Sequence, residues 1–392
     1  MNFDLLAPKV QEFIENSLML NFTKVALMKN PFPEIPWNEI LNQIASKAKA
    51  KEKLPTWYYQ KNIVFPNKLS IEQTSSEITA QYKSSLISGK TLIDLTGGFG
   101  VDDYYFSKNF NHLIHCEIKT DLHEITKHNF NNLQASNIDC YLGNSHDTLE
   151  KLNQHFDWIY IDPSRRNDAK GKVFLLKDCL PNVPFYLDFY FKFTKHILIK
   201  TAPILDLSAG LSELRNVKEI HIVALQNEVK ELLWIVEKGY SDPVLIKTIN
   251  ITKEENEIVE FIWGKEPFNC EYSKVQSFLY EPNSAIMKSG AFDHICHLFP
   301  VNKLHSFSHL YTNNERIKFP GRRFKVIKNI PYTKIEIKKY LEGKKANITT
   351  RNFPETVETI RKKWKIKEGG NLYTFFTTDL DNNKIILLCE KI

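Results

Sequence analysis

Thr91-Leu92-Ile93-Asp94-Leu95-Thr96-Gly97-Gly98-Phe99-Gly100-Val101-Asp102 is the stretch of sequence that decides the fold. An apolar run ends at the carboxylate of Asp94, glycines follow, and a helical pattern then begins. This order predicts a β-strand, a turn and a helix. Because glycine has no side chain, Gly98 and Gly100 let a ligand approach the backbone of the turn closely.

The spacing of the glycines argues against a dinucleotide-binding turn. The pattern G-x-G-x-x-G, which rests a pyrophosphate on a helix N-terminus, does not occur here. Counted from Asp94, the turn reads Asp94-x-Thr96-x-Gly98-x-Gly100. It resembles the D/E-x-G-x-G-x-G motif of class I methyltransferases that use S-adenosylmethionine (SAM), with Thr96 in the first glycine position. A tight strand-to-helix connection without a ligand is the alternative, because short glycine patterns also occur by chance.

Two further predicted strands end in polar residues that suit a nucleoside. Residues 112–117 predict a second strand ending in Glu117, about where a Rossmann-like fold has the carboxylate that binds ribose hydroxyls. Residues 139–145 predict a third strand with a Gly-Asn end, and the side-chain carbonyl of Asn144 is a candidate for binding the adenine amino group. Taken alone, either residue is more often a solvated turn residue.

The predicted fourth strand leads into a candidate catalytic loop. Residues 156–161 are apolar and stop at Asp162-Pro163, because proline cannot donate to a sheet. Open α/β sheets bind ligands at the carboxyl ends of their strands. The loop Asp162-Pro163-Ser164-Arg165 resembles motif IV of methyltransferases, with Ser164 replacing the second proline and Arg165 the aromatic residue. A plain turn is the alternative.

The residues of this loop have separate expected roles. We expect Asp162 to contact the cofactor and to orient the nucleophile of the substrate. Pro163 and Ser164 shape the loop. Arg165 is a candidate to hold a substrate phosphate in a bidentate manner.

The remaining pattern completes one sheet. Residues 196–203 predict a fifth strand, and residues 219–225 and 231–236 predict a closing pair. The sequence therefore predicts an α/β fold built on a seven-stranded Rossmann-like methyltransferase sheet. Before the first strand, a polar segment leads into a helix, and Gln73 and Thr74 are candidates to close over the cofactor. A helix N-cap explains these two residues nearly as well.

Composition indicates a soluble protein. The chain has 392 residues, enough for two to four domains, and no apolar run approaches the ~18 residues that suggest a membrane span. No signal-peptide pattern opens the sequence, so we expect a cytoplasmic location. The six cysteines lack C-x-x-C spacing, and we expect them to be reduced and unpaired. The His and Cys residues between positions 293 and 309 have poor zinc spacing, so we assign no metal.

The two ends of the chain differ from the predicted sheet. Residues 1–70 have apolar residues at helical spacing, which predicts a helical domain. Residues 315–392 hold 19 Lys and Arg against 9 Asp and Glu, a net charge of +10 in a chain of +6. A basic appendage suggests delivery of a polyanion to the site, although charge runs are often simply solvated. The candidate nucleic-acid contacts are Arg322, Arg323, Arg361, Lys362, Lys363 and Trp364, the last by stacking on a base.

Five stretches of the sequence together carry a family resemblance: residues 72–77, 94–101, 161–166, 280–290 and 364–370. They resemble a bacterial family of class I methyltransferases that carry a small ferredoxin-like domain and a C-terminal THUMP-like domain. The resemblance implies SAM as the cofactor. THUMP domains bind RNA in RNA-modifying enzymes, so it also implies an RNA substrate, tRNA or rRNA.

The patterns and the resemblance together predict four domains. These are a helical domain (1–70), a SAM-dependent methyltransferase domain (71–265), a ferredoxin-like domain (266–319) and a THUMP-like domain (320–392). The expected function is methylation of RNA, with the basic C-terminal domain binding the substrate. One alternative is a small-molecule methyltransferase with a solubilising tail. Another is a non-catalytic RNA-binding protein, because Thr96 and Asn144 depart from the methyltransferase pattern.

Overall fold

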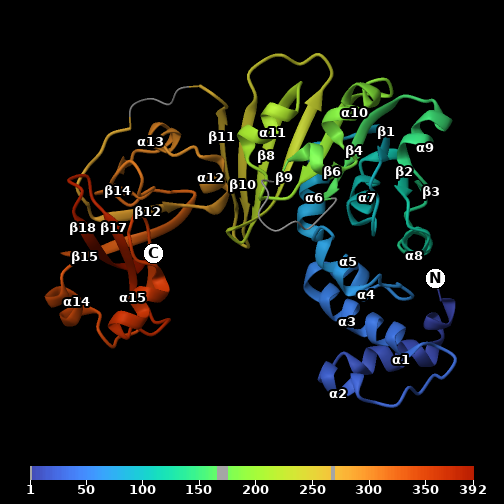
Figure 1. Ribbon diagram of the computed structural model, residues 1–392, viewed down its shortest axis with the longest axis horizontal. Helices are drawn as coiled ribbons and strands as arrows, with labels where there is room; N and C mark the ends of the chain where they lie inside the picture. Colours follow the sequence, from blue (N-terminus) through green and yellow to red (C-terminus); the bar gives the residue numbers. More distant parts are fainter. Residues whose placement is uncertain (1, 166–174, 266–269) are drawn as a thin grey trace. The chain divides into compact units, whose positions relative to one another are not determined.

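The computed structural model describes residues 2–165, 175–265 and 270–392. The chain divides into two compact units. The first comprises Met1–Lys218 and Leu233–Ser241, and the second comprises Glu219–Leu232 and Asp242–Ile392. Figure 1 shows the elements of both units. Across the described residues, none of the helices has the length and apolar character needed to cross a membrane.

Parallel strands form the centre of the first unit. Their cores are apolar and rich in β-branched residues, which favours strands that are buried on both faces. β1 pairs with β2 on one side and with β4 on the other, and the pairs β2–β3 and β4–β7 are also parallel. The strands are β1 (Gly89–Asp94), β2 (Phe110–Glu117), β3 (Ile138–Leu142), β4 (Phe156–Ile161) and β7 (Thr194–Thr201).

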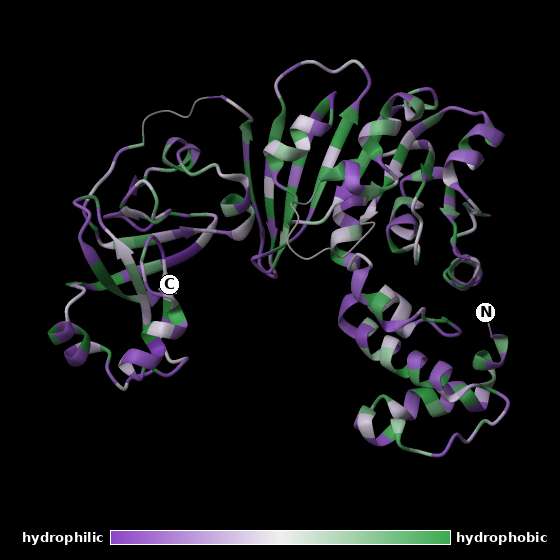
Figure 2. Ribbon diagram, viewed as in Figure 1, coloured by the Kyte–Doolittle hydropathy of each residue, from purple (hydrophilic) through white to green (hydrophobic). Residues whose placement is uncertain are grey.

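The complete sheet is longer than the seven strands that the sequence predicts. Its hydrogen-bonded order is β11-β10-β8-β9-β7-β4-β1-β2-β3. All seven predicted strands are present, and β10 and β11 extend the sheet as an antiparallel pair. In Figure 2, hydrophobic residues are frequent along the strands of this sheet. The further strands are β8 (Val217–Leu225), β9 (Glu228–Glu237), β10 (Leu245–Ile251) and β11 (Asn256–Ile262).

The segments that link the parallel strands are helical, as expected for parallel crossovers. Two short strands, β5 (Ser164–Arg165) and β6 (Cys179–Leu180), pair beside the candidate loop. The linking helices are α7 (Val101–Phe106), α8 (Thr120–Asn132), α9 (Ser145–Leu152), η2 (Leu176–Asp178), α10 (Val183–Tyr190) and α11 (Leu207–Glu213).

The N-terminal part of the chain is helical, as its apolar spacing predicts. Trp57 of this part is fully buried. The centroid of its ring lies 6.3 Å from that of Phe99, which precedes α7, and 6.3 Å from that of Tyr105, which lies in α7. The N-terminal helices therefore share a hydrophobic core with the first helix after the glycine turn. They are η1 (Phe3–Leu6), α1 (Pro8–Ser17), α2 (Phe22–Ala26), α3 (Trp37–Lys53), α4 (Pro55–Tyr59), α5 (Lys68–Gln73) and α6 (Glu77–Leu86).

The second unit contains a sheet of its own, with the order β13-β14-β12-β15-β18-β17-β16. Its longest strand, β15, contains the candidate nucleic-acid contacts Arg322 and Arg323. The strands are β12 (Phe278–Pro282), β13 (Asn302–Lys303), β14 (Tyr311–Asn313), β15 (Gly321–Pro331), β16 (Asn347–Thr350), β17 (Tyr373–Thr378) and β18 (Lys384–Lys391). The helices are α12 (Ser284–Ser289), α13 (His294–Leu298), α14 (Lys334–Tyr340) and α15 (Val357–Trp364).

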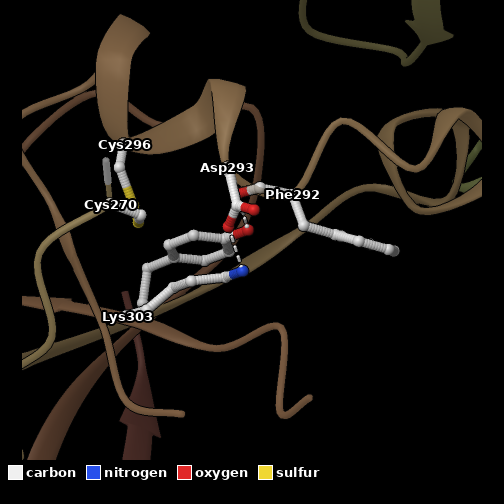
Figure 3. The surroundings of a disulfide bond; sticks show 6 residues. Cys270, Phe292, Asp293, Cys296 and Lys303 are labelled. Atoms are coloured by element: carbon white, nitrogen blue, oxygen red, sulfur yellow. Dashed lines mark hydrogen bonds and ion pairs between the residues drawn. A yellow bond between two sulfur atoms is a disulfide. The ribbon is translucent and has the colours of Figure 1, made fainter. Parts of the chain in front are cut away.

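A disulfide corrects the expectation that all six cysteines are unpaired. Cys270 and Cys296 are joined, with 5.5 Å between their Cα atoms (Figure 3). Beside this bond, the buried Lys303 forms an ion pair with Asp293. Spacing rules for cysteine motifs could not predict the pairing, because the two residues are 26 positions apart and meet only in the folded unit.

Candidate functional site

The three glycines of the turn have different physical reasons to be glycine. A Cβ on Gly97 would lie 2.1 Å from the His115 ring, and one on Gly100 would lie 2.4 Å from Phe130. Gly98 has φ +59°, and its Cβ would meet nothing nearer than the Thr96 carbonyl oxygen at 3.7 Å. Packing therefore requires Gly97 and Gly100, whereas Gly98 borders open space in which a ligand can contact the backbone.

The hydroxyl of Thr96 connects the turn to the candidate catalytic loop. It donates a hydrogen bond of 2.9 Å to Asp94 Oδ1 and accepts one of 2.7 Å from the backbone N–H of Asp162. The backbone N–H of Thr96 also donates to Asp94 Oδ1, at 2.7 Å. Glycine at position 96 would lack the hydroxyl, so this departure from the glycine motif has a structural consequence.

Glu117 lies on the other side of the turn. Its Oε2 accepts a 3.0 Å hydrogen bond from the backbone N–H of Gly98, and its Oε1 accepts one of 2.8 Å from that of Lys119. The residue that follows it, Ile118, is 66% exposed. A carboxylate thus contacts the backbone of Gly98, and an exposed apolar side chain is its neighbour in sequence.

Asn144 is exposed and begins α9. Its Oδ1 accepts a 2.8 Å hydrogen bond from the backbone N–H of His146, which makes it the N-cap of that helix. The side-chain carbonyl of Asn144, which the sequence predicts to bind adenine, therefore already accepts one hydrogen bond within the protein. A carbonyl oxygen has a second lone pair, which this cap leaves for another donor.

Beneath the turn lies a buried acidic cluster. Burial raises the pKa of Asp94 well above its ordinary value, and the nearby Asp103 raises it further. Burial likewise raises the pKa of Asp103, whose Oδ2 lies 2.5 Å from His115 Nδ1. Burial lowers the pKa of His115. The cluster therefore favours neutral forms and stiffens the base of the turn.

A second polar cluster, which the sequence analysis missed, lies between the turn and the candidate loop. Ser75 donates a 2.9 Å hydrogen bond to Asp102 Oδ2, and Tyr160 donates one of 2.7 Å to the same atom. Lys83 is fully buried, with its Nζ 3.2 Å from Asp102 Oδ1. Lys200 lies at the end of β7, with its Nζ 3.9 Å from Asp102 Oδ2. We call Ser75, Lys83, Asp102, Tyr160 and Lys200 the lysine cluster.

The lysine cluster reaches the candidate loop through one ion pair. The ammonium of Lys200 pairs with Asp162 Oδ2 and donates a 3.3 Å hydrogen bond to Ser75. Burial alone would raise the pKa of Asp102, but Lys83 and Lys200, with hydrogen bonds from neighbouring hydroxyls, lower it below its ordinary value. The Asp162 side chain is 37% exposed, against 12% for that of Lys200. The cluster thus runs from a buried interior to a solvent-accessible carboxylate.

The chain is similar to known proteins both in two C-terminal domains and over its whole length. Residues 278–320 match the model of a ferredoxin-like domain, and residues 321–391 match that of a THUMP domain-like family. A solved structure described as a "putative methyltransferase" from Porphyromonas gingivalis W83 is 30% identical, with a TM-score of 0.88. The similarity covers 99% of this chain and 98% of that chain. The chain belongs to this methyltransferase family.

Other similarities are far weaker. An rRNA methylase from Streptococcus thermophilus is 12% identical, with a TM-score of 0.30 over 41% of this chain and 94% of that chain. An O-methyltransferase from Bacillus cereus, solved in complex with SAH, is 11% identical, with a TM-score of 0.33 over 48% of this chain and 99% of that chain. A search of curated proteins gives no match. The membership of the methyltransferase family thus rests on the Porphyromonas protein, and the class I methyltransferase fold agrees with the strand order described above.

The remaining predicted site residues lie at the end of α5 and in the candidate loop. Gln73 is exposed at the end of α5, and Thr74 follows it, partly exposed. Pro163 is buried, and Ser164 is exposed and pairs with Leu180 through β5 and β6. The backbone of Arg165 belongs to β5, and Arg166 lies outside the described residues.

The predicted RNA-binding residues have unequal exposure. Lys362 and Lys363 are exposed on α15, and Lys363 lies 3.1 Å from Glu355. Arg322 is partly exposed and pairs with the buried Glu281. The remaining candidates, Arg323 and Arg361, are partly exposed.

Trp364 requires a correction. It is only 7% exposed and belongs to the core around Ile360 and Phe376. Its ring faces are therefore covered, and stacking on a base is not available to it in this structure. The basic residues that flank Trp364 suggested a surface position, whereas its spacing of four from Ile360 on α15 is typical of a buried helix face.

Proposed function

We propose that the chain is a SAM-dependent methyltransferase that acts on RNA. The observation that carries the proposal is the set of direct hydrogen bonds linking Glu117, the glycine turn and Asp162 at one edge of a methyltransferase sheet. Membership of the methyltransferase family supports the enzyme class. In this proposal, residues 1–70, 71–265, 266–319 and 320–392 remain the four functional domains.

The residues beside the turn fit the cofactor. Glu117 would accept hydrogen bonds from the ribose hydroxyls, because its carboxylate lies against Gly98. The exposed Ile118 offers apolar surface to the adenine, and Asn144 a polar contact. Gly98 would let the ligand contact the backbone, since the space beside it is open. SAM supplies a methyl group on a sulfonium, which a nucleophile of the acceptor attacks in line.

The protein's contribution to methyl transfer would be mainly positioning. The Thr96 hydroxyl fixes the backbone of Asp162 relative to the turn, so the candidate loop and the cofactor site share one frame. Asp162 would accept a hydrogen bond from the nucleophile and orient its lone pair. Orientation of two reactants contributes up to about 7–11 kcal/mol to rate acceleration. Pro163 and Ser164 would set the loop shape, and Arg165 would hold a phosphate.

The RNA substrate is proposed from charge and from the THUMP domain-like match. Residues 315–392 carry the net charge of +10, and residues 321–391 match that family model. Exposed lysines on α15 would contact phosphates, which gives affinity that falls steeply with salt. A small-molecule methyltransferase would not show this dependence.

The experiment uses the full-length protein, labelled SAM and total RNA from cells that lack it. The expected result is label in RNA at one nucleotide, located by mass spectrometry, with no label for the Asp162→Ala variant. Lys195→Met is the matched control, because Lys195 is exposed on β7, away from the lysine cluster. Label found only in small molecules would contradict the RNA assignment. Folded protein that fails to bind SAM in calorimetry would contradict the enzyme assignment.

A further inference from the structure

Lys200 lies where the ammonium group of its side chain can meet a ligand bound at the glycine turn. β1 lies between β2 and β4, and β7 is the next strand beyond β4. Glu117 ends β2, whereas Asp162 follows β4 and Lys200 lies near the end of β7. A ligand with its ribose at Glu117 that crosses the turn at Gly98 therefore extends toward Lys200.

The charges of the lysine cluster and of Asp162 balance. Lys83 and Lys200 oppose Asp102 and Asp162, and Lys83 already lies 3.2 Å from Asp102 in the interior. Lys200 is the more solvent-accessible of the two lysines, and its distance to Asp102 is longer, 3.9 Å. A small anion that reached Lys200 would compete with the carboxylate of Asp162, which is more exposed than that of Asp102.

Ser75 holds Lys200 in position. Its hydroxyl oxygen accepts hydrogen bonds from Lys200 Nζ at 3.3 Å and from Lys83 Nζ at 3.1 Å, and its proton is donated to Asp102 Oδ2. An ammonium group has three N–H donors and forms charge-assisted hydrogen bonds with a carboxylate. The lysine cluster therefore presents a positioned ammonium donor beside the turn and one strand beyond Asp162.

We propose that Lys200, held in position by Ser75, binds the α-carboxylate of the methionine part of SAM, exchanging its partner Asp162 for that carboxylate. This inference rests on the proposed function. Binding of the cofactor would release Asp162 Oδ2 from Lys200. Asp162 would then be available to the methyl acceptor only after the cofactor is bound.

The test compares SAM with decarboxylated SAM, which differs by the carboxylate alone, in calorimetric titrations of the full-length protein. The wild-type protein is expected to bind SAM at least about tenfold more tightly, since charge-assisted hydrogen bonds contribute on this scale. In Lys200→Met, the two ligands should bind almost equally. Lys195→Met is the matched control and should keep the wild-type ratio.

Ser75→Ala is the second variant, and it should partly reduce the preference for SAM over decarboxylated SAM. This variant is used if Lys200→Met does not fold. The preference of the wild-type protein is measured without any variant. Equal affinity of the wild-type protein for the two ligands would overturn the inference while leaving SAM dependence intact. The same holds if Lys200→Met keeps the wild-type preference for SAM over decarboxylated SAM. Failure of the folded wild-type protein to bind either ligand would overturn the proposed function itself.

Discussion

The side chain of Thr96 and the backbone of Asp162 are joined by a 2.7 Å hydrogen bond, although 66 residues separate them in sequence. Thr96 accepts this bond and donates another to Asp94. Thr96 occupies a position where the motif that this turn resembles has glycine. A glycine here would have no hydroxyl. The hydroxyl of Thr96 instead joins the turn to the candidate catalytic loop by a hydrogen bond.

Replacing Thr96 with valine tests this link. Thr96→Val keeps the shape but removes the hydroxyl, leaving the N–H of Asp162 without its acceptor. We expect a loss of about 1 kcal/mol in the free energy of unfolding, because the variant loses this partly buried hydrogen bond. Denaturant titration measures it, and calorimetry with SAM should show weaker binding. Thr96→Ser retains the hydroxyl and is the control. A Thr96→Val protein as stable as wild type would contradict the structural role of the link.

Alanine substitutions separate the two roles of the turn glycines. Gly100→Ala should cost about 1–3 kcal/mol from overpacking, with strain at φ +73° added, since the new Cβ would lie 2.4 Å from Phe130. Gly98→Ala meets no close atom, so its stability loss should be smaller, about 1–2 kcal/mol from the positive φ. Its SAM affinity should nevertheless fall. Thermal unfolding and calorimetry distinguish the two effects, and equal losses of stability would contradict the assignment.

Much of the sheet could be predicted because apolar runs and strand-ending carboxylates are local signals. Asp94, Glu117 and Asp162 each follow or end such a run, and parallel strands bring these ends to one edge. The lysine cluster had no such signal. Ser75 and Lys200 are 125 residues apart, and lysines in sequence usually indicate surface. The only hint for Lys83 is its spacing of three from Ala80 on the buried face of α6.

The second unit shows two ways in which local patterns mislead. Basic neighbours made Trp364 a candidate for base stacking, yet packing against Ile360 buries it. Side-chain burial depends on the strands that cover a helix, and a charge run does not reveal them. The Cys270–Cys296 bond was likewise invisible, because the pairing depends on how α13 packs rather than on cysteine spacing.

The disulfide predicts a thiol count. Protein unfolded without reductant should expose four thiols, those of Cys116, Cys140, Cys179 and Cys389, and six after reduction. Cys296→Ser should lower the free energy of unfolding by about 3 kcal/mol, the loop-closure value for a loop of this size. Thiol titration in denaturant without reductant measures the number of free thiols. Six reactive thiols before reduction would contradict the bond.

Substitutions on α15 separate packing from RNA binding. Trp364→Ala should cost about 3–5 kcal/mol of stability, because it empties a buried aromatic site. Lys362→Ala, on the exposed face, should change stability by no more than about 0.5 kcal/mol. It should weaken RNA binding and reduce the salt slope by about 1. Electrophoretic binding at several salt concentrations measures the slope. A stable Trp364→Ala protein with lost RNA binding would instead favour stacking.

The buried acids beneath the turn predict how stability changes with pH. The folded-state pKa values of Asp94 and Asp103 are raised by burial, so the folded protein binds more protons there than the unfolded chain. Their contribution to stability is complete below the unfolded value of about 3.9 and is lost as the pH rises through the raised values. The lowered pKa of His115 acts in the opposite direction, and its contribution is lost as the pH falls below its unfolded value of about 6.5.

Asp103→Asn isolates the acidic term. The amide keeps the shape and can accept from the His115 ring, but it takes up no proton. The stability of the variant relative to wild type should therefore improve steadily as the pH rises from 5 to 8. Urea denaturation at each pH measures the two free energies of unfolding. Parallel curves for the two proteins across this range would show that Asp103 does not hold a raised pKa, and the buried cluster would then be ionised beneath the turn.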